Sequence, residues 1–198
     1  MLARRTRGTT VNDVLLAALA VAIRRWNVAH GWRAGRITLT MPVNLRPDAW
    51  RTDVVGNFAS YMTLSIGATD DRDVARAIEV IGGQTRAIKR EGLAGMIIDL
   101  LAGPSLLTIA TKRRLSNLIP LTFDVVVDTA SLSNLGTVDR LPVEAVWFSP
   151  PGRMPLGAML GAVTLDGRLH LTLRYRRAQF DPAGAQAFAR LYRDVLLA

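Results

Sequence analysis

The chain has 198 residues and a formal net charge of +9, and 49% of its residues are hydrophobic. This length and hydrophobic content predict one folded domain with a sizeable core. The absence of cysteine excludes disulfides, thiolate nucleophiles and cysteine-bound zinc, and His30 and His170 lie too far apart in sequence to suggest a histidine-rich metal site. We therefore predict no metal site.

The positive charge comes almost entirely from arginine, because Lys89 and Lys112 are the only lysines. The arginines are scattered, apart from short clusters at residues 4–7 and 112–114. An anionic ligand or partner would explain this charge, and so would an arginine-rich solvated surface. Because no continuous basic stripe or recognition motif is present, the sequence predicts no binding to nucleic acid.

Residues 1–10 are predicted to form a basic, irregular N-terminal arm. Basic residues before an apolar run suggest a secretory signal, but Asn12 and Asp13 interrupt the approach and no small-residue cleavage site follows. The apolar run, Val14–Ile23, is too short to span a bilayer. The sequence therefore predicts no membrane span and a cytoplasmic location.

The first predicted element is a helix over Val11–Ala29. The uninterrupted apolar residues that follow Asp13 predict burial on nearly all sides of this helix. Thr10 takes the N-cap position, and Asp13 stands three residues later, which is the spacing of a capping box. Gly31 is the expected C′ residue, and His30 in the last turn suits the helix dipole.

Two strands and a second helix are predicted next. Alternating apolar residues indicate strands over Arg36–Val43 and Phe58–Ile66. A helix that ends near Arg90 is predicted to be capped by Thr69–Asp71. The pair Gly82–Gly83 in its middle indicates either a break or the close approach of another element.

The second half of the chain is predicted to hold further helices and strands, with no repeat or long linker. On the last strand, basic and polar side chains share one face with His170, and this face is predicted to be wet. These elements predict one α/β domain with a mixed sheet and packed helices. The remaining elements are a helical stretch over Leu93–Ser116, a strand over Phe123–Thr129 that ends in the polar turn Ser131–Gly136, a strand over Val143–Phe148, a hairpin of Leu156–Leu165 and Arg168–Arg176 across Asp166–Gly167, and a final helix from Asp181.

The chain shows no glycine-rich phosphate loop, no paired-histidine spacing and no nucleophile elbow. Polar residues gather instead at the ends of predicted elements, in Asn12–Asp13, Asn44–Arg46, Asn57 and Ser133–Asn134. Polar groups that converge on an apolar groove form a ligand site. The same residue types also serve as caps, turns and bulges, so both interpretations stay open at this point.

Four motifs resemble, in this order, the C-terminal lobe of the condensation-domain superfamily, the acyltransferases with the chloramphenicol-acetyltransferase-like fold. This superfamily includes nonribosomal-peptide condensation domains, polyketide-associated acyltransferases and wax ester synthase/diacylglycerol acyltransferases. The resemblance implies that residues 11–198 form a single lobe of the two-lobe, CoA-dependent acyltransferase fold. The motifs are Thr-Val-Asn-Asp-Val-Leu-Leu-Ala-Ala from Thr10, Met-Pro-Val-Asn-Leu-Arg-Pro from Met41, Val-Gly-Asn-Phe from Val55 and Ser-Asn-Leu-Gly from Ser133.

In that family an acyl group passes from a thioester to a hydroxyl or amine acceptor, in a tunnel between two lobes. A His-His-x-x-x-Asp-Gly motif on the N-terminal lobe supplies the general base. This chain has no His-His pair, and the Asp-Phe-Gly-Trp-Gly motif of related plant enzymes is also missing. The resemblance therefore implies a lobe without a catalytic residue, inactive alone and an acyltransferase only beside an N-terminal lobe. Its donor substrate would be acyl-CoA or a phosphopantetheine thioester, and no cofactor would be tightly bound.

The missing base also supports a second hypothesis, a non-catalytic docking or scaffold module for a carrier protein or a partner lobe. The expected partners are an N-terminal acyltransferase lobe, further copies of this chain, or an acyl carrier protein. A face that meets a second lobe is expected to expose an apolar patch and to promote self-association.

The resemblance assigns nine residues to the substrate tunnel or its braces. Two of them, Asn12 and Asp13, match the Asn-Asp motif of the wax ester synthase branch. Bracing is favoured over substrate contact for Asp13 and Arg46, whereas both roles stay open for Ser133 and Asn134. The nine residues are Asn12, Asp13, Asn44, Arg46, Gly56, Asn57, Ser133, Asn134 and Gly136.

Overall fold

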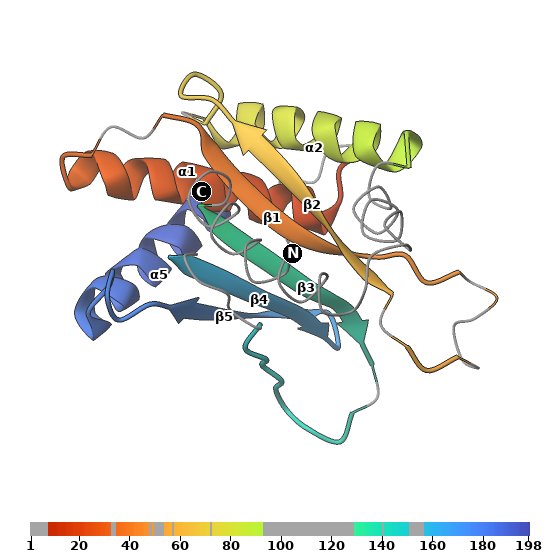
Figure 1. Ribbon diagram of the computed structural model, residues 1–198. Helices are drawn as coiled ribbons and strands as arrows, with labels where there is room; N and C mark the ends of the chain where they lie inside the picture. The colour runs from red at the N-terminus through yellow and green to blue at the C-terminus, as the bar shows by residue number, and fades with distance from the viewer. Residues whose placement is uncertain are drawn as a thin grey trace, which may run out of the picture.

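A computed structural model of the chain describes residues 8–32, 35–47, 49, 54–56, 58–71, 73–92, 129–139, 141–150 and 157–198. Within these ranges five strands form one mixed sheet, and three helices cover one of its faces (Figure 1). The predicted α/β class is therefore confirmed. The predicted helical stretch Leu93–Ser116 and almost all of the predicted strand Phe123–Thr129 lie outside the described residues.

The sheet has the strand order β2-β1-β3-β4-β5. Strand β1 pairs parallel with β3, and β3 pairs parallel with β4, whereas β2 and β5 are antiparallel to their neighbours. Strands β1, β3 and β4 therefore all finish at one end of the sheet, at Asn44, Val138 and Leu165, which we call the carboxyl end. The elements are α1 (Val11–Ala29), β1 (Ile37–Asn44), β2 (Ala59–Ile66), α2 (Val74–Arg90), β3 (Ala130–Val138), β4 (Ala158–Leu165), β5 (Arg168–Tyr175) and α5 (Pro182–Leu197).

Helix α1 has the predicted bounds and the predicted capping box. The Thr10 hydroxyl oxygen accepts from the Asp13 N–H (3.2 Å), and the Asp13 carboxylate accepts from the Thr10 N–H (2.7 Å). Gly31 follows with a φ of +77°, a left-handed conformation that suits glycine at C′. The helix lies between α2 and α5 and packs against one face of the sheet, behind it in Figure 1, which explains why the apolar run Val14–Ile23 is buried on all sides.

Helix α2 begins later than the sequence predicts. Its N-cap is Asp73, whose carboxylate accepts from the Arg76 N–H, and not the stretch Thr69–Asp71. The predicted cap was wrong because Asp71 turns inward, where its carboxylate lies 2.6 Å from the guanidinium of Arg24. A buried carboxylate requires such a partner.

The glycine pair does not break α2, but one of its members permits a close approach. A Cβ on Gly82 would lie 3.2 Å from Arg86 Nη1 and 3.8 Å from the carboxylate of Asp13, so α2 packs closely against the start of α1. Among the described residues, no atom lies within 4 Å of the corresponding position on Gly83. Of the two predicted explanations, the close approach is confirmed, at Gly82.

We expect Gly83→Ala to raise the free energy of unfolding by about 0.5–1 kcal/mol, because alanine restricts the unfolded chain and the helix surface there is open. Gly82→Ala is the matched control. The free energy of unfolding should rise less in Gly82→Ala, because the Arg86 side chain must move away from the new methyl group. Urea unfolding followed by far-UV circular dichroism measures both variants, and a loss of stability in Gly83→Ala would contradict the open environment.

Helix α5 is joined to α1 by a buried phenol. The Tyr192 hydroxyl donates to the carbonyl oxygen of Leu15 at 3.2 Å. Burial raises the pKa of Tyr192 far above its ordinary value of 10.0, because the charged phenolate would lose its hydration. Above that ordinary value the folded chain keeps a proton that the unfolded chain releases, so the folded state loses stability as the pH rises.

We therefore expect the free energy of unfolding to fall above about pH 10, with this phenol contributing up to about 1.4 kcal/mol per pH unit. Tyr192→Phe should cost roughly 1 kcal/mol at neutral pH, through the lost hydrogen bond, and should flatten the alkaline fall. Urea midpoints measured between about pH 8 and pH 11 test this. Identical slopes in both proteins would show that Tyr192 is not the responsible group.

Strand β3 includes the predicted polar turn Ser131–Gly136 and continues to Val138. The prediction of a turn was wrong because Ala130 and Leu132 alternate with the two serines in a ladder between β1 and β4. Only Gly136 has a turn-like backbone, with a φ of +80°, and it lies where the register against β4 shifts.

The predicted strand Val143–Phe148 is not part of the sheet and pairs with no described strand. The chain instead crosses the face of β4 and β5 that lies opposite the helices. The carbonyl oxygen of Phe148 lies 2.6 Å from where a Cβ on Gly161 would be, and Arg174 donates to the carbonyl oxygen of Pro150 at 3.1 Å. Glycine is therefore required at position 161.

This crossing corrects the prediction of a wet face on β5 at one residue, His170. The ring of Trp147 lies edge-on to the ring of His170, with 5.5 Å between their centroids. The Nε2 atom of His170 is buried and has no hydrogen-bond partner within the described part of the chain. Tertiary contacts, which the strand's own alternation does not encode, cover this face around His170, whereas Arg168 and Arg174 on the same face are exposed, as predicted.

The C-terminal hairpin and helix match the prediction. Asp166 and Gly167 both have positive φ values, of 47° and 76°, as a two-residue hairpin turn requires. Asp181 caps α5 by accepting from the Gly184 N–H at 2.6 Å, and proline occupies the first turn.

Candidate site at the carboxyl end of the sheet

The predicted site residues gather at the carboxyl end of the sheet, although they come from distant parts of the chain. They meet there because β1 and β3 run parallel and α1 begins at the same end (Figure 1). Asn57 lies outside the described residues. The others are Asn12 and Asp13 at the start of α1, Asn44 and Arg46 at the end of β1, Gly56 before β2, and Ser133, Asn134 and Gly136 in β3.

Asn134 connects the start of α1 to the irregular part of β3. Its Nδ2 donates to Asn12 Oδ1 at 2.6 Å, which joins residues 122 positions apart, and its Oδ1 accepts from the Gly136 N–H at 2.9 Å. Both ends of the Asn134 amide are therefore used within the chain. Ser133 alternates with Asn134 and lies on the opposite face of the sheet, so the structure does not bring Ser133 to this pair.

We expect Asn134→Ala to cost about 1–3 kcal/mol of unfolding free energy, because Gly136 and Asn12 lose their partner. In a double-mutant cycle with Asn12→Ala, the two losses should fall short of additivity by about 0.5–1.5 kcal/mol. Ser133→Ala is the neighbouring control and should change stability little. Strictly additive losses, measured by urea unfolding, would contradict the direct Asn12–Asn134 bond.

Asp13 has the geometry of a helix cap. Its side chain is buried, and Oδ2 accepts from the backbone N–H and the hydroxyl of Thr10, at 2.7 Å and 2.8 Å. Oδ1 has no hydrogen-bond partner among the residues that the structure describes. A carboxylate at a helix N-terminus is stabilised by the exposed N–H groups and the helix dipole, so Asp13 supports α1 from the interior.

Arg46 holds the connection between β1 and β2. The Asn44 side chain accepts from the Arg46 N–H at 3.0 Å, and the guanidinium donates to the carbonyl oxygens of Val54 and of Gly56, the latter at 2.9 Å. The same guanidinium lies 4.4 Å from the ring centroid of Phe58. A Cβ on Gly56 would lie 3.0 Å from that ring, which explains the glycine.

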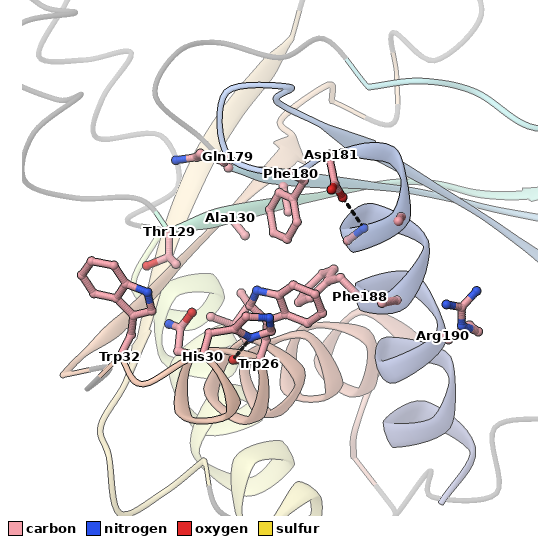
Figure 2. Close-up of a pocket in the computed structure, with 17 residues that line it drawn as sticks. Trp26, His30, Trp32, Thr129, Ala130, Gln179, Phe180, Asp181, Phe188 and Arg190 are labelled. Carbon is pink, nitrogen blue, oxygen red and sulfur yellow. Dashed lines mark hydrogen bonds between the residues drawn. The ribbon is translucent and has the colours of Figure 1, made fainter.

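An open groove of about 1310 Å³ lies at the opposite end of the sheet, between the last turns of α1, the starts of β3 and β4, and the start of α5 (Figure 2). Trp26 forms its floor, packed against Phe180 and Phe188 and stacked on the ring of His30 at 4.1 Å. The groove could not be predicted from the sequence, because its residues come from separate elements. Trp32, a large aromatic residue that follows α1 and lies exposed on the rim, is a sequence feature that could have indicated the groove.

Neither histidine lies beside the Asn12–Asn134 pair. His30 is the C-cap of α1, as its predicted position in the last turn suggests, and its Nδ1 lies 2.7 Å from the carbonyl oxygen of Trp26. Across the ranges that the structure describes, no three His, Cys, Asp or Glu side chains are grouped so as to hold a metal ion. In the same ranges, no helix is long and apolar enough to cross a membrane.

Comparison with known sequences finds relatives that are longer than this chain. No family model matches the sequence. Two Mycobacterium tuberculosis proteins described as uncharacterized, MT2362 and Rv2305, are 41% identical to this chain over an alignment of 207 positions, which covers 98% of this chain and 48% of each relative. The chain thus spans about half the length of the curated relatives it matches.

Solved structures with the same fold include domains of peptide synthetases. The epimerization domain of the third module of tyrocidine synthetase B has a TM-score of 0.61 at 23% identity and matches 96% of this chain and 41% of its own. The starter condensation domain of rhizomide synthetase has a TM-score of 0.59 at 12% identity and matches 93% and 41%. The cyclization-docking bidomain EpoB from Sorangium cellulosum has a TM-score of 0.58 at 19% identity and matches 96% and 36%. The chain therefore has the condensation-domain-like fold and corresponds in extent to about two fifths of such a domain.

Proposed function

We propose that this chain is the C-terminal lobe of an acyltransferase or condensation enzyme. Together with a histidine-bearing second lobe, it moves an acyl group from a CoA or carrier-protein thioester to a hydroxyl or amine. The observation that carries the proposal is the convergence of the motif residues, above all the Asn12–Asn134 bond, at one end of a condensation-domain-like sheet.

In this proposal the lobe supplies a rigid wall, and the partner lobe supplies the proton acceptor. Asn134 and Arg46 use their polar atoms to hold α1, β3 and the β1–β2 connection in place. Groups fixed in this way keep a bound thioester and acceptor in a reactive arrangement without reorganising during the reaction. The acyl donor is a substrate and needs no tightly bound cofactor.

The charge of the chain supports the same class of donor. Coenzyme A and phosphopantetheine both carry phosphate, and a net charge of +9 attracts anionic ligands over a distance of about 10 Å at moderate salt. The missing His-His pair favours a second candidate, a non-catalytic module that docks a carrier protein or a partner lobe.

The test mixes this chain with a separately produced N-terminal acyltransferase lobe that carries His-His-x-x-x-Asp-Gly, an acyl-CoA and an amine or alcohol acceptor. Released CoA thiol is measured with a thiol reagent, to which this cysteine-free chain contributes no background. We expect release above the sum of the separate lobes. Replacing the motif histidine in the partner should abolish it.

Association of the two lobes without thiol release would contradict the acyltransferase proposal and favour the docking module. A titration with an acyl carrier protein, followed by NMR, then tests that candidate. Absence of shifts at millimolar carrier concentration would contradict it.

A further inference from the structure

Strand β5 forms one border of the sheet, because it pairs with β4 on one side and with no described strand on the other (Figure 1). The two-residue turn makes Leu165 and Arg168 a hydrogen-bonded pair. At the other end of the strand, the Arg176 N–H donates to the carbonyl oxygen of Gly157 at 3.3 Å. Hydrogen-bonded and non-hydrogen-bonded pairs alternate along an antiparallel ladder, so every second residue between these two pairs directs its N–H and C=O away from β4. These outward residues are Leu169, Leu171, Leu173 and Tyr175.

The backbone groups of the outward residues have no hydrogen-bond partner within the described ranges. The other border of the sheet, β2, is different, because the side chain of Gln84 closes it at one position. Gln84 Nε2 donates to the Ser65 carbonyl oxygen at 2.8 Å, and Gln84 Oε1 accepts from the Ser65 N–H at 3.0 Å. A side-chain amide thus takes the place of a neighbouring strand. Proteins protect exposed edges in such ways because a free edge pairs with another chain.

The two faces of β5 differ in chemistry along this free edge. On the side of the helices, the three leucines of the outward set are half-buried and pack only partly against the core. On the other side, Arg168 and Arg174 are exposed, and neither is paired with a carboxylate of the described residues. Arg174 donates to the neutral carbonyl of Pro150, which leaves its charge uncompensated. An added strand therefore meets apolar surface on one face and positive charge on the other.

These two faces identify the chemistry of the partner. A strand in which apolar side chains alternate with acidic ones would cover the leucines with one set and pair the arginines with the other. A second copy of β5 is a poor partner. The antiparallel register that uses all four outward residues would place Arg168 opposite Arg176 of the other copy, and like charges directly opposite each other are destabilising.

We propose that the outer edge of β5 is a binding site for an extended acidic segment of another polypeptide, which adds a further strand to the sheet. Backbone hydrogen bonds to the outward residues supply the affinity, and the leucine and arginine faces supply the specificity. This inference goes beyond the proposed acyl transfer and does not depend on it.

The test uses a capped peptide as long as β5, eight residues, in which valine alternates with glutamate. Fluorescence anisotropy of a trace of labelled peptide measures binding to the intact chain. We expect saturable binding, and binding at least about fivefold weaker when lysine replaces glutamate. N-methylation of one alternate set of peptide residues should abolish binding, whereas N-methylation of the other set should not, because only one row of N–H groups faces β5. These probes leave the protein itself unchanged.

Leu171→Pro tests the edge from the side of the protein. Proline is tolerated at an edge position whose N–H faces solvent, and here it removes an outward donor. Binding of the valine–glutamate peptide should weaken about tenfold. Thr63→Pro is the matched control on β2. Thr63 lies two residues before Ser65, so its N–H also points away from β1, and this variant should change the dissociation constant less than about twofold.

Arg168→Glu tests the charged face separately, and it should reverse the preference between the glutamate and lysine peptides. Failure of the glutamate peptide to bind, equal binding of both N-methylated peptides, or equal weakening by Leu171→Pro and Thr63→Pro would overturn the inference. Sedimentation of the chain alone addresses the other occupant. A dimer that Leu171→Pro abolishes would show that a second copy occupies the edge, which contradicts the partner proposed here.

Discussion

Replacing Asp71 with asparagine should lower the free energy of unfolding by about 3–5 kcal/mol. The Asp71 side chain is 0% exposed, and that of its partner Arg24 is only 11% exposed. The Arg24 Nε lies 2.8 Å and 2.7 Å from the two carboxylate oxygens, and its Nη2 also donates to the carbonyl oxygen of Gly35. Asparagine would leave this guanidinium without its countercharge in a place that water reaches poorly.

Asp70→Asn is the matched control. Asp70 pairs with Arg76 at 3.2 Å, but the Arg76 side chain is 56% exposed, so solvent screens this pair and its loss should cost far less than the loss of the buried pair. The double variant Arg24→Met with Asp71→Leu should recover much of the stability, because it removes both charges together. Urea unfolding of all three variants is the measurement. Equal costs for Asp70→Asn and Asp71→Asn would contradict the buried pair.

Leu19→Ala should cost about 2–5 kcal/mol, since truncation of a fully buried side chain removes apolar burial and leaves a cavity. Leu19 lies in the middle of α1, within the core between α2, α5 and the sheet. Leu197→Ala is the same change on an exposed position of α5, where the side chain is 73% exposed, and should stay within about 0.5 kcal/mol.

Thermal and urea unfolding, followed by circular dichroism, measure both leucine variants. A loss below about 1 kcal/mol in Leu19→Ala would show that α1 is not the central helix of the core. A comparable loss in Leu197→Ala would show that α5 is buried at its C-terminal end.

The sequence was a poorer guide to β3 and to the connection that follows it. Ser131–Gly136 has the composition of a turn, yet it extends as a strand because β1 and β4 supply hydrogen-bond partners on both sides. Val143–Phe148 has the composition of a strand, yet no described strand pairs with it. In both places the available neighbours outweighed the local propensity.

The candidate site also contains both features that the sequence predicts and features that it does not. Thr10 and Asp13 could be placed correctly, since a capping box acts within four residues. The bond between Asn12 and Asn134 could not be predicted from spacing, because it joins residues 122 positions apart. The resemblance to a family placed both residues near one tunnel, and the structure brings them into contact but leaves Ser133 on the other face of the sheet.

By itself, the sequence determined the elements whose signals are local: α1, the hairpin across Asp166–Gly167 and α5, where caps, turn residues and apolar periodicity act over a few positions. Only the tertiary structure decided that Asp71 would pair with Arg24 instead of capping a helix, and that the chain near Phe148 would cross Gly161. These outcomes depend on burial and on partners distant in sequence. The energy of a buried charge or of a close backbone contact is set by what surrounds it, and no local period encodes those surroundings.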